Sequence, residues 1–245
     1  MPLPKINAPI FELNLPSTGQ VVKYRPFLVK EQKILMIAME SEDERSITVA
    51  IKQIINNCAI DSIDVEKLPV FDIEYFFTRL RAKSVGETVD LKLRHRNVIN
   101  KKGEICKHET QKKFDLMQLE VLRNPEHTDK IIIDEETGIG VKMKYPMMDP
   151  EPVSTEGKTQ LDLATIAIKN SIDYIFDNEN IYKKEDTTDE ELLNFIDSLS
   201  QTQFEKVAKF FETMPKLKHK ISWKCGGCGE EDSVELEGMS NFFVF

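Results

Sequence analysis

The spacing of apolar residues along the chain changes several times and predicts an α+β fold. Residues 1–27 form the first segment. Apolar and polar residues alternate in Ile10–Leu15 and again in Val21–Phe27, and the turn-forming sequence Ser17-Thr18-Gly19 lies between them. Strict alternation is typical of a half-buried strand. The segment is therefore expected to form an N-terminal β-hairpin.

From residue 28 to residue 86 the apolar residues recur with helical spacing. In the second of three such stretches, Ile47, Ala50, Ile51, Ile54 and Ile55 follow the i, i+3, i+4, i+7 pattern of an amphipathic helix. A glycine that follows the last stretch is a common helix C-terminal signal. We expect a three-helix unit formed by Lys30–Met39, Asp43–Cys58 and Asp72–Ala82.

The middle of the chain, residues 87–146, returns to alternation and predicts two β-hairpins. The first would pair a strand over Thr88–His95 with a return strand over Cys106–Leu116, across the turn-forming loop Asn97–Gly103. The second would pair Lys130–Asp134 with Gly140–Tyr145. The following Pro-, Ser- and Gly-containing stretch, 147–158, has the composition of a linker.

The last segment, residues 159–245, is expected to start helical and to end as a small zinc-ribbon-like hairpin that packs back on residues 87–146. Apolar periodicity predicts helices over Leu161–Phe176, Glu190–Leu199 and Ser200–Thr213. Alternation over Leu217–Trp223 predicts a strand that runs into Cys225, with Ser233–Glu237 as its partner. The terminal Phe242–Phe245 needs cover from the protein's own core or from a partner.

Composition and charge narrow the class of protein. A hydrophobic fraction of 40% with 31% charged residues is typical of a globular domain, and the length allows one large domain or two small ones. The net charge of −9 argues against generic binding to nucleic acid or to an anionic membrane. No apolar run approaches the roughly 20 residues of a membrane span. The first residues lack the pattern of a signal peptide, so we expect a cytosolic protein.

The sequence Cys225-Gly-Gly-Cys228-Gly is the clearest chemical signal. Two thiolates at this spacing can bind one tetrahedral zinc ion when the backbone between them forms a tight knuckle, which glycine permits. The alternatives are a redox pair and a pair of structural thiols that bind no metal. A redox pair requires the first thiol at the start of a helix, whereas here a strand is predicted to lead into the motif and no helix is predicted to follow it. In a cytosolic chain a metal site is favoured over a disulfide. Cys58 lies in an apolar run and is expected to be a buried, inert thiol.

One CxxC motif supplies half of a zinc site, so further ligands are needed. Cys106 and His95 lie on opposite sides of the Asn97–Gly103 loop, where cross-strand neighbours are about 5 Å apart. His108 shares the parity of Cys106 and competes with His95 as fourth ligand, and His219 is a further candidate. A closed four-ligand site is structural and not catalytic. His127 is interpreted as a solvated loop residue.

Enzyme signatures are not found in the sequence. It contains no phosphate-binding glycine loop, no nucleophile elbow and no HExxH motif, and its acidic runs are typical of solvated helix starts. We expect a non-enzymatic protein that acts through protein–protein contacts. The alternative is a zinc-ribbon adaptor that binds nucleic acid or polymerase during replication or transcription, for which the lysines at 216, 218, 220 and 224 could supply a basic face. Lysines on an edge strand also prevent aggregation.

Several phrases of the sequence resemble one protein family. YRPFLVKEQKILMIAMESED, IKQIINNC, LPVFDIEYFFTRLRAKSVGE and FFETMPKLKHKISWKCGGCG…LEGMSNFFVF are similar to the baseplate hub proteins of T-even-type contractile-tailed phages, the gene product 26-like family. The resemblance extends from about Tyr24 to Phe245. The stretch Leu28–Gly86 also looks like small phage tail-assembly chaperones.

This resemblance implies a structural or assembly protein of the baseplate hub in a contractile viral tail. It would be made in the host bacterial cytoplasm and work in the virion tail with other hub subunits and the tape-measure protein as partners. In similar chains the hairpin loop and the late knuckle are expected to contribute paired cysteines. Here His95 stands at the near side of the loop, which leaves the choice of fourth ligand between His95 and His108 open.

Overall fold

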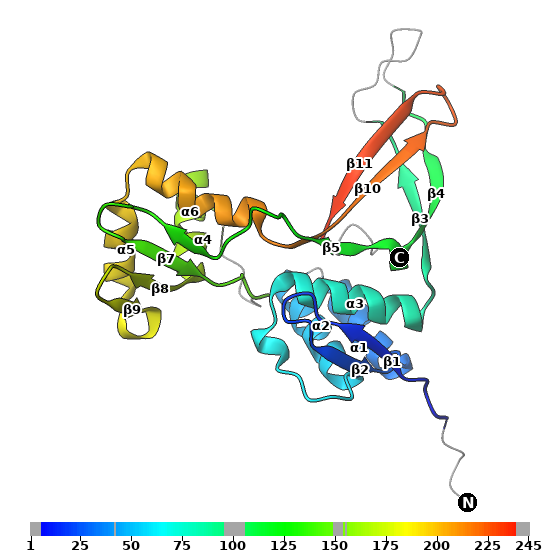
Figure 1. The fold of residues 1–245 in the computed structure, drawn as a ribbon. Coiled ribbons are helices and arrows are strands. Elements are labelled where there is room, and N and C mark those ends of the chain that lie inside the picture. The colour runs from blue at the N-terminus through cyan, green and yellow to red at the C-terminus, as the bar shows by residue number, and fades with distance from the viewer. Residues whose placement is uncertain (1–5, 42, 96–105, 149–153, 155, 239–245) are drawn as a thin grey trace, which may run out of the picture. The chain divides into compact units, whose positions relative to one another are not determined.

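The computed structural model has the mixed α+β architecture that the sequence predicts. It describes residues 6–41, 43–95, 106–148, 154 and 156–238. The chain divides into two compact units, and each is described here by itself (Figure 1). Unit 1 comprises Met1–Leu122 with Lys216–Phe245, and unit 2 comprises Arg123–Pro215. The predicted loop over Asn97–Gly103 and the terminal Phe242–Phe245 lie outside the described residues.

Unit 1 begins with the predicted hairpin and three-helix arrangement. Strands β1 (Phe11–Asn14) and β2 (Val21–Tyr24) pair antiparallel. Its helices and 3-10 turns are α1 (Val29–Glu40), α2 (Glu44–Cys58), η1 (Val65–Lys67), α3 (Val70–Ser84) and η2 (Leu116–Gln118). All three helices lie within a few residues of their predicted bounds.

The apolar stripe of α2 explains its position. Ala50, Ile51, Ile54 and Ile55 are all buried, as the helical spacing predicts. Asp43 caps the start of the helix, because its carboxylate accepts hydrogen bonds from the backbone N–H groups of Arg45 and Ser46. Local capping and one apolar face therefore determine this element.

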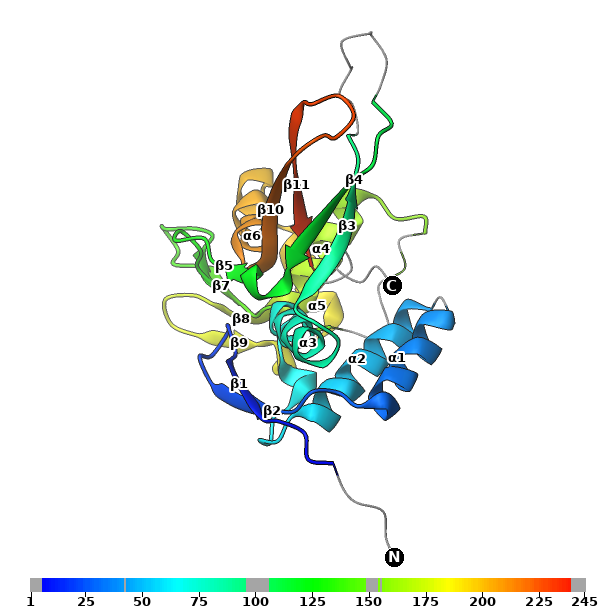
Figure 2. The ribbon, with the colours of Figure 1, turned by 90° about the vertical axis from the view of Figure 1, so that its right-hand side faces the viewer.

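The remaining strands of unit 1 form two small antiparallel sheets. Strands β3 (Thr88–Leu93) and β4 (Thr110–Asp115) pair with each other. The second sheet has the order β11-β10-β5, formed by Glu231–Glu237, Lys216–Lys224 and Glu120–Leu122. The β3–β4 pair corresponds to the hairpin predicted over Thr88–Leu116, and β10–β11 corresponds to the one predicted over Leu217–Glu237, whereas β5 was not predicted (Figure 2).

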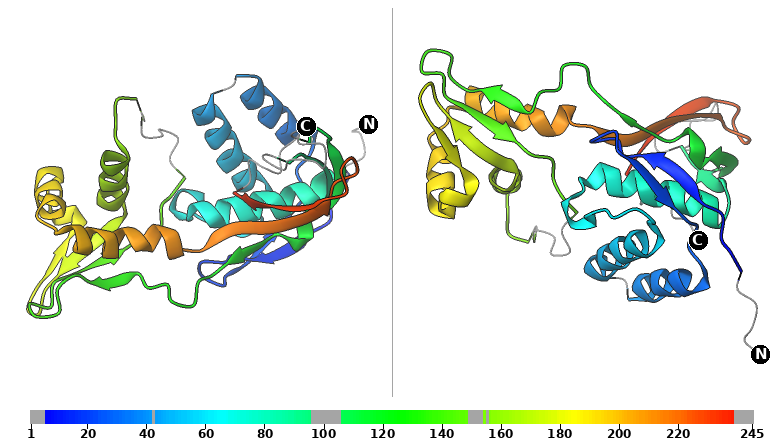
Figure 3. Two further views of the ribbon diagram at one scale, coloured as in Figure 1. Left: turned by 90° about the horizontal axis from the view of Figure 1, so that it is seen from above. Right: turned by 60° about the horizontal axis from the view of Figure 1, so that its bottom comes forward.

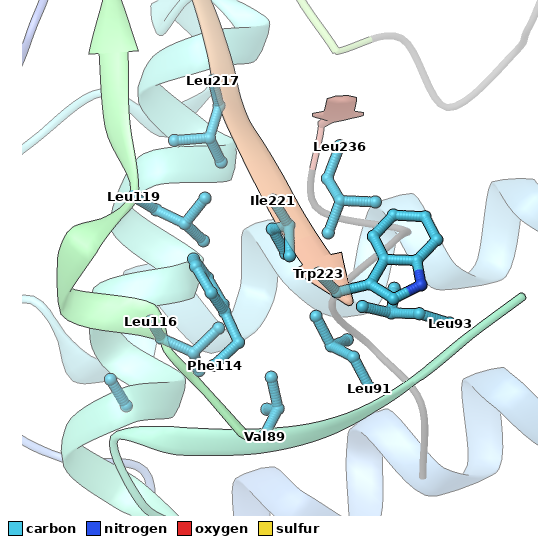
Figure 4. Packing of buried hydrophobic residues seen from close by; sticks show 11 residues of the cluster. Val89, Leu91, Leu93, Phe114, Leu116, Leu119, Leu217, Ile221, Trp223 and Leu236 are labelled. Atoms are coloured by element: carbon cyan, nitrogen blue, oxygen red, sulfur yellow. The ribbon is translucent and has the colours of Figure 1, made fainter. Parts of the chain in front are cut away.

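A hydrophobic cluster joins these two sheets. Strand β3 contributes side chains from alternate positions of one face, namely Val89, Leu91 and Leu93. Strand β10 likewise contributes Leu217, Ile221 and Trp223 from one of its faces (Figure 4). Every one of these side chains is less than a tenth exposed. Because both hairpins contribute alternate residues to one core, the loop ends of the hairpins are brought to the same place. The candidate site lies there.

Unit 2 is a four-stranded antiparallel sheet packed with helices (Figure 3). The order is β6-β7-β8-β9, and Ile131, Val141 and Ile172 of this sheet share a core with Ile168 of α4, Leu192 of α5 and Phe210 of α6. Its elements are β6 (Lys130–Ile132), β7 (Gly140–Met143), α4 (Gln160–Ser171), β8 (Ile172–Phe176), β9 (Ile181–Lys183), η3 (Lys184–Asp186), α5 (Asp189–Asp197) and α6 (Gln201–Thr213).

The predicted helix over Leu161–Phe176 is wrong in its last third. Helix α4 ends at Ser171, and the following Ile172–Phe176 is strand β8, which pairs with β7 on one side and β9 on the other. The apolar residues at 168, 172, 175 and 176 fit a helical period, but this stretch is rich in β-branched and aromatic residues, which favour a strand. Pairing with β7 and β9 in the folded sheet favours the strand over the helix.

No helix in the part of the chain that the structure describes combines the length and apolar character needed to cross a membrane.

Candidate metal centre

Four side chains from three separate parts of unit 1 meet at the loop ends of the two hairpins. His95 follows β3, Cys106 precedes β4, and Cys225 and Cys228 lie in the turn between β10 and β11. One ligand atom from each residue lies within 4.8 Å of all the others. Imidazole nitrogen and thiolate sulfur are metal ligands, so this cluster could bind a metal ion.

The CxxC turn is a tight knuckle. The Cys225 N–H donates to the Glu230 carbonyl at 2.9 Å, and the Gly229 N–H donates to the Cys225 carbonyl at 2.9 Å. Gly229 has a φ of 77°, a conformation that glycine adopts without strain. The turn thus directs both thiols to the same side.

Backbone N–H groups in the knuckle act directly on the sulfur atoms. Hydrogen bonds from the N–H groups of Cys228 and Gly227 lower the pKa of the Cys225 thiol to about 6. The N–H of Glu230 acts in the same sense on Cys228, but burial and the adjacent thiols outweigh it and raise the pKa of Cys228. Deprotonation of Cys225 near neutral pH provides the form that binds metal.

Two distances within the cluster are close to the edges of a tetrahedral zinc site. Tetrahedral zinc with Zn–S bonds of about 2.3 Å and Zn–N bonds of about 2.05 Å separates two sulfur ligands by about 3.8 Å, and sulfur from nitrogen by about 3.6 Å. The Sγ atoms of Cys106 and Cys225 lie 3.7 Å apart, and Nε2 of His95 lies 3.5 Å from Sγ of Cys228. The donor set and these two distances therefore fit a metal ion bound between the four side chains.

His95 is held on two sides. Its side chain is completely buried, and its ring lies 5.9 Å from the ring of Trp223. Its Nδ1 lies 2.6 Å from Oδ2 of Asp232 in β11. This hydrogen bond raises the pKa of His95 and lowers the pKa of Asp232.

The other histidine candidates lie outside the cluster. His108 packs against the knuckle, so close that a β-carbon added to Gly227 would stand 2.6 Å from the His108 β-carbon. The ring of His219 lies 4.8 Å from the ring of Phe114. Gly227, the second of the two glycines between the cysteines, therefore makes room for His108 as well as for the tight turn.

The surroundings of Cys58 and His127 test what the sequence suggested for these two residues. Cys58 is completely buried, which confirms the expected burial, and this burial raises the pKa of its thiol to about 11. The interpretation of His127 as a solvated residue is wrong. Its two ring nitrogens lie 2.9 Å from the Thr213 hydroxyl and 3.2 Å from the Tyr145 hydroxyl, and its ring stacks on the Tyr145 ring.

The resemblance that the sequence suggests is supported by comparison with known families. Residues 8–244 match the model of the family described as T4 bacteriophage base plate protein. The chain belongs to this family. Comparison with curated proteins and with solved structures finds no significant match. As a base plate family member, the chain is assigned to the phage tail, where it works with other baseplate components.

The sequence did not reveal one residue that contacts the cluster of this base plate protein, Asp232. A signal was nevertheless present, because Asp232 shares strand parity with Val234 and Leu236, which contribute to the hydrophobic cluster. An acidic residue on the inner side of a strand requires a partner, since burial of an unpaired charge is costly. His95 is that partner, although it lies 137 positions away.

The lysines beside the knuckle are matched by glutamates on β11. The register places Lys218 opposite Glu237, Lys220 opposite Glu235 and Lys224 opposite Glu231. Lys216 and Lys218 form ion pairs with Glu237 at 3.1 and 2.9 Å, and Lys218 also pairs with Glu235 at 2.9 Å. Opposite charges in cross-strand positions stabilise a two-stranded ribbon. The ribbon of this base plate protein therefore carries both signs of charge.

Proposed function

We propose that this protein is a structural or assembly subunit of the baseplate hub in a contractile phage tail. It acts by protein–protein contacts, without catalysis, and contains a structural zinc site. Membership of the base plate family over residues 8–244 is the observation that carries the tail role. The resemblance of several sequence phrases to hub proteins supports the narrower assignment to the hub.

Zinc is the metal that best suits the cluster. Three cysteines and one histidine form one of the usual donor sets of structural zinc sites. Four protein ligands complete a tetrahedral coordination and leave no position for water or substrate, which supports a structural and non-enzymatic role. His95, Cys106, Cys225 and Cys228 would hold the ion.

The ion would tie together hairpins that are distant in the sequence. Cys106 and Cys225 are separated by 119 positions, and closing so long a loop in the unfolded chain is entropically costly. Metal binding free energy would therefore become folding free energy for unit 1.

The partners we propose are other hub subunits and the tape-measure protein. The protein would bind them during assembly in the host cytoplasm and remain in contact with them in the finished tail. A nucleic-acid adaptor would require a free basic surface near the knuckle. The ion pairs of Lys216 and Lys218 with glutamates, and a net charge of −9, favour the structural role.

Two measurements test this proposal. Metal analysis of pure protein is expected to give about one equivalent of zinc per chain, and a value below about half an equivalent would contradict the zinc site. Co-purification from infected cells and mass spectrometry of assembled tails should recover the protein with hub subunits. Retention on DNA or RNA filters that falls steeply across a salt series, without hub subunits, would support the adaptor instead.

A further inference from the structure

The carboxylate of Asp232 lies outside the four clustered side chains and contacts one of them, His95. Its Oδ2 lies 2.6 Å from Nδ1 of His95, while the opposite ring nitrogen, Nε2, faces Sγ of Cys228 at 3.5 Å. The two nitrogens therefore have different surroundings. One meets a carboxylate and the other meets the sulfur atoms.

We propose that Asp232 is a positioning residue of the metal site, which fixes Nε2 of His95 as the ligand atom and holds the ring in place for binding. This inference rests on the proposed zinc site. A neutral imidazole carries one proton, and its unprotonated nitrogen is the one that can bind a metal. A carboxylate that accepts a hydrogen bond from Nδ1–H keeps the proton there and leaves the Nε2 lone pair free.

The strand register places Asp232 where this role requires it. Asp232 is the cross-strand partner of Trp223 in the β10–β11 hairpin, so both side chains project from the same face. The Trp223 ring packs near the His95 ring, 5.9 Å away and inclined by 30°, while Asp232 binds its edge. The imidazole is thus restrained in both rotation and tilt by one residue pair.

Asp232 also connects the two hairpins through a polar contact. His95 follows β3, whereas Asp232 belongs to β11, and the two are 137 positions apart. Its side chain is 30% exposed, so the carboxylate retains contact with water and remains charged. A charged acceptor makes the imidazole a stronger metal ligand than a neutral acceptor would.

The test compares three substitutions in the full-length protein by competition with a chromophoric zinc chelator. Asp232→Ala removes the acceptor and its charge, and is expected to weaken zinc binding by about 10- to 100-fold. Asp232→Asn keeps an oxygen that can accept from Nδ1–H but removes the charge, and should lie between Asp232→Ala and the unmodified protein. Glu231→Ala is the matched control, because Glu231 is exposed and lies opposite Lys224 on the other face.

Spectroscopy separates positioning from a general effect on folding. Nitrogen-15 NMR of the zinc-loaded protein should show His95 protonated at Nδ1 and metal-bound at Nε2. In Asp232→Asn, which preserves the shape of the side chain, the Nδ1 resonance should shift while the Trp223 fluorescence stays unchanged.

The outcomes are distinct. If the unmodified protein and Glu231→Ala bind zinc and Asp232→Ala binds it equally tightly, Asp232 has no positioning role. Equal weakening by Asp232→Ala and Glu231→Ala would also overturn the inference, because the effect would then reflect the charge of the strand. Failure of the unmodified protein to bind zinc would instead refute the zinc site itself.

Discussion

The thiol sulfur of Cys106 lies 3.7 Å from that of Cys225, although the two residues are 119 positions apart. A disulfide requires about 2.05 Å between sulfur atoms, so the pair is not bonded. The distance instead matches the edge of a zinc-centred tetrahedron, about 3.8 Å. This relationship joins the β3–β4 hairpin to the β10–β11 hairpin.

The first prediction concerns the fourth ligand. His95→Ala should abolish tight zinc binding, because Nε2 of His95 lies within the cluster. His108→Ala should retain about one equivalent of zinc, because His108 packs on the knuckle and lies outside the cluster. Metal analysis of both variants after dialysis decides between them. Loss of zinc in His108→Ala with retention in His95→Ala would reverse the assignment.

Metal removal should loosen unit 1 selectively. At a free zinc concentration about 1,000 times the Kd, bound metal contributes about 4 kcal/mol to the stability of the folded state. A strong chelator is therefore expected to lower the unfolding temperature of unit 1. Trp223 is the single tryptophan of the chain and lies beside His95, so its fluorescence reports this transition.

Hydrogen exchange supplies the control for metal removal. Peptides from β3, β4, β10 and β11 should exchange faster after chelation, while peptides from β6 to β9 in unit 2 should keep their protection. Equal loss of protection in both units would contradict a local structural role for the metal.

Sequence reasoning succeeded where the determinants of structure are local. The stripe of Ile51, Ile54 and Ile55 and the cap at Asp43 are encoded within one helix, and α2 was predicted almost to the residue. The CxxC motif likewise contains its own turn. Cys106 was found because a loop base can hold two nearby ligands, an argument that uses only neighbouring strands.

The features that sequence reasoning missed depend on distant contacts. Ile172–Phe176 becomes strand β8 because β7 and β9 pair with it on both sides. The contact of Asp232 with His95 spans 137 positions, and that of His127 with Thr213 spans 86. Periodicity says which face of an element is buried, but it does not say which distant residue lies opposite.

Gly227 should not tolerate a side chain. A β-carbon there would lie 2.6 Å from the β-carbon of His108, well inside van der Waals contact. Gly227→Ala is expected to destabilise the knuckle by about 1–3 kcal/mol, the usual cost of overpacking. Trp223 fluorescence during urea unfolding measures the change in unit 1.

A second substitution tests the cause of that clash. His108→Gly removes the opposing β-carbon and should restore much of the stability lost in Gly227→Ala. His108→Ala keeps this atom and should restore little. If both double variants behave alike, the close approach of the two β-carbons is not the reason for the glycine.

The ion pair between Arg25 and Glu31 is expected to stabilise the N-terminal part of unit 1. Glu31 is completely buried, and its carboxylate binds Nη2 of Arg25 at 3.1 Å and the Leu28 N–H at 2.9 Å. Glu31→Ala leaves both donors without this acceptor. We expect a loss of about 2–4 kcal/mol, somewhat below the cost of breaking a fully buried pair because Arg25 is 20% exposed.

Glu12→Ala is the matched control for this pair. Glu12 lies 3.9 Å from Lys23, and both side chains are more than half exposed. Its removal should change stability by less than about 0.5 kcal/mol. Urea unfolding of both variants, followed by Trp223 fluorescence, provides the comparison. Similar effects of the two substitutions would show that burial of Glu31 does not matter.

His127 should make unit 2 less stable in mild acid. Burial lowers the pKa of His127, and the nearby Asp129 opposes this only in part. The unfolded chain, with a histidine pKa of about 6.5, therefore binds the proton more strongly than the folded protein does. Stability from the neutral ring is fully present above pH 6.5 and is lost as the pH falls through the lower folded pKa.

The measurement is an NMR titration of His127 together with hydrogen exchange of unit 2 between pH 7.5 and 5. His127→Phe keeps an aromatic ring between Tyr145 and Phe210 but cannot titrate. The overall stability of this variant should fall, because the hydrogen bonds to Thr213 and Tyr145 are lost. The additional loss of unit 2 stability caused by protonation of His127 in mild acid should nevertheless disappear. An unchanged acid sensitivity in His127→Phe, or a His127 pKa at or above 6.5, would show that this ring does not control the pH dependence of unit 2.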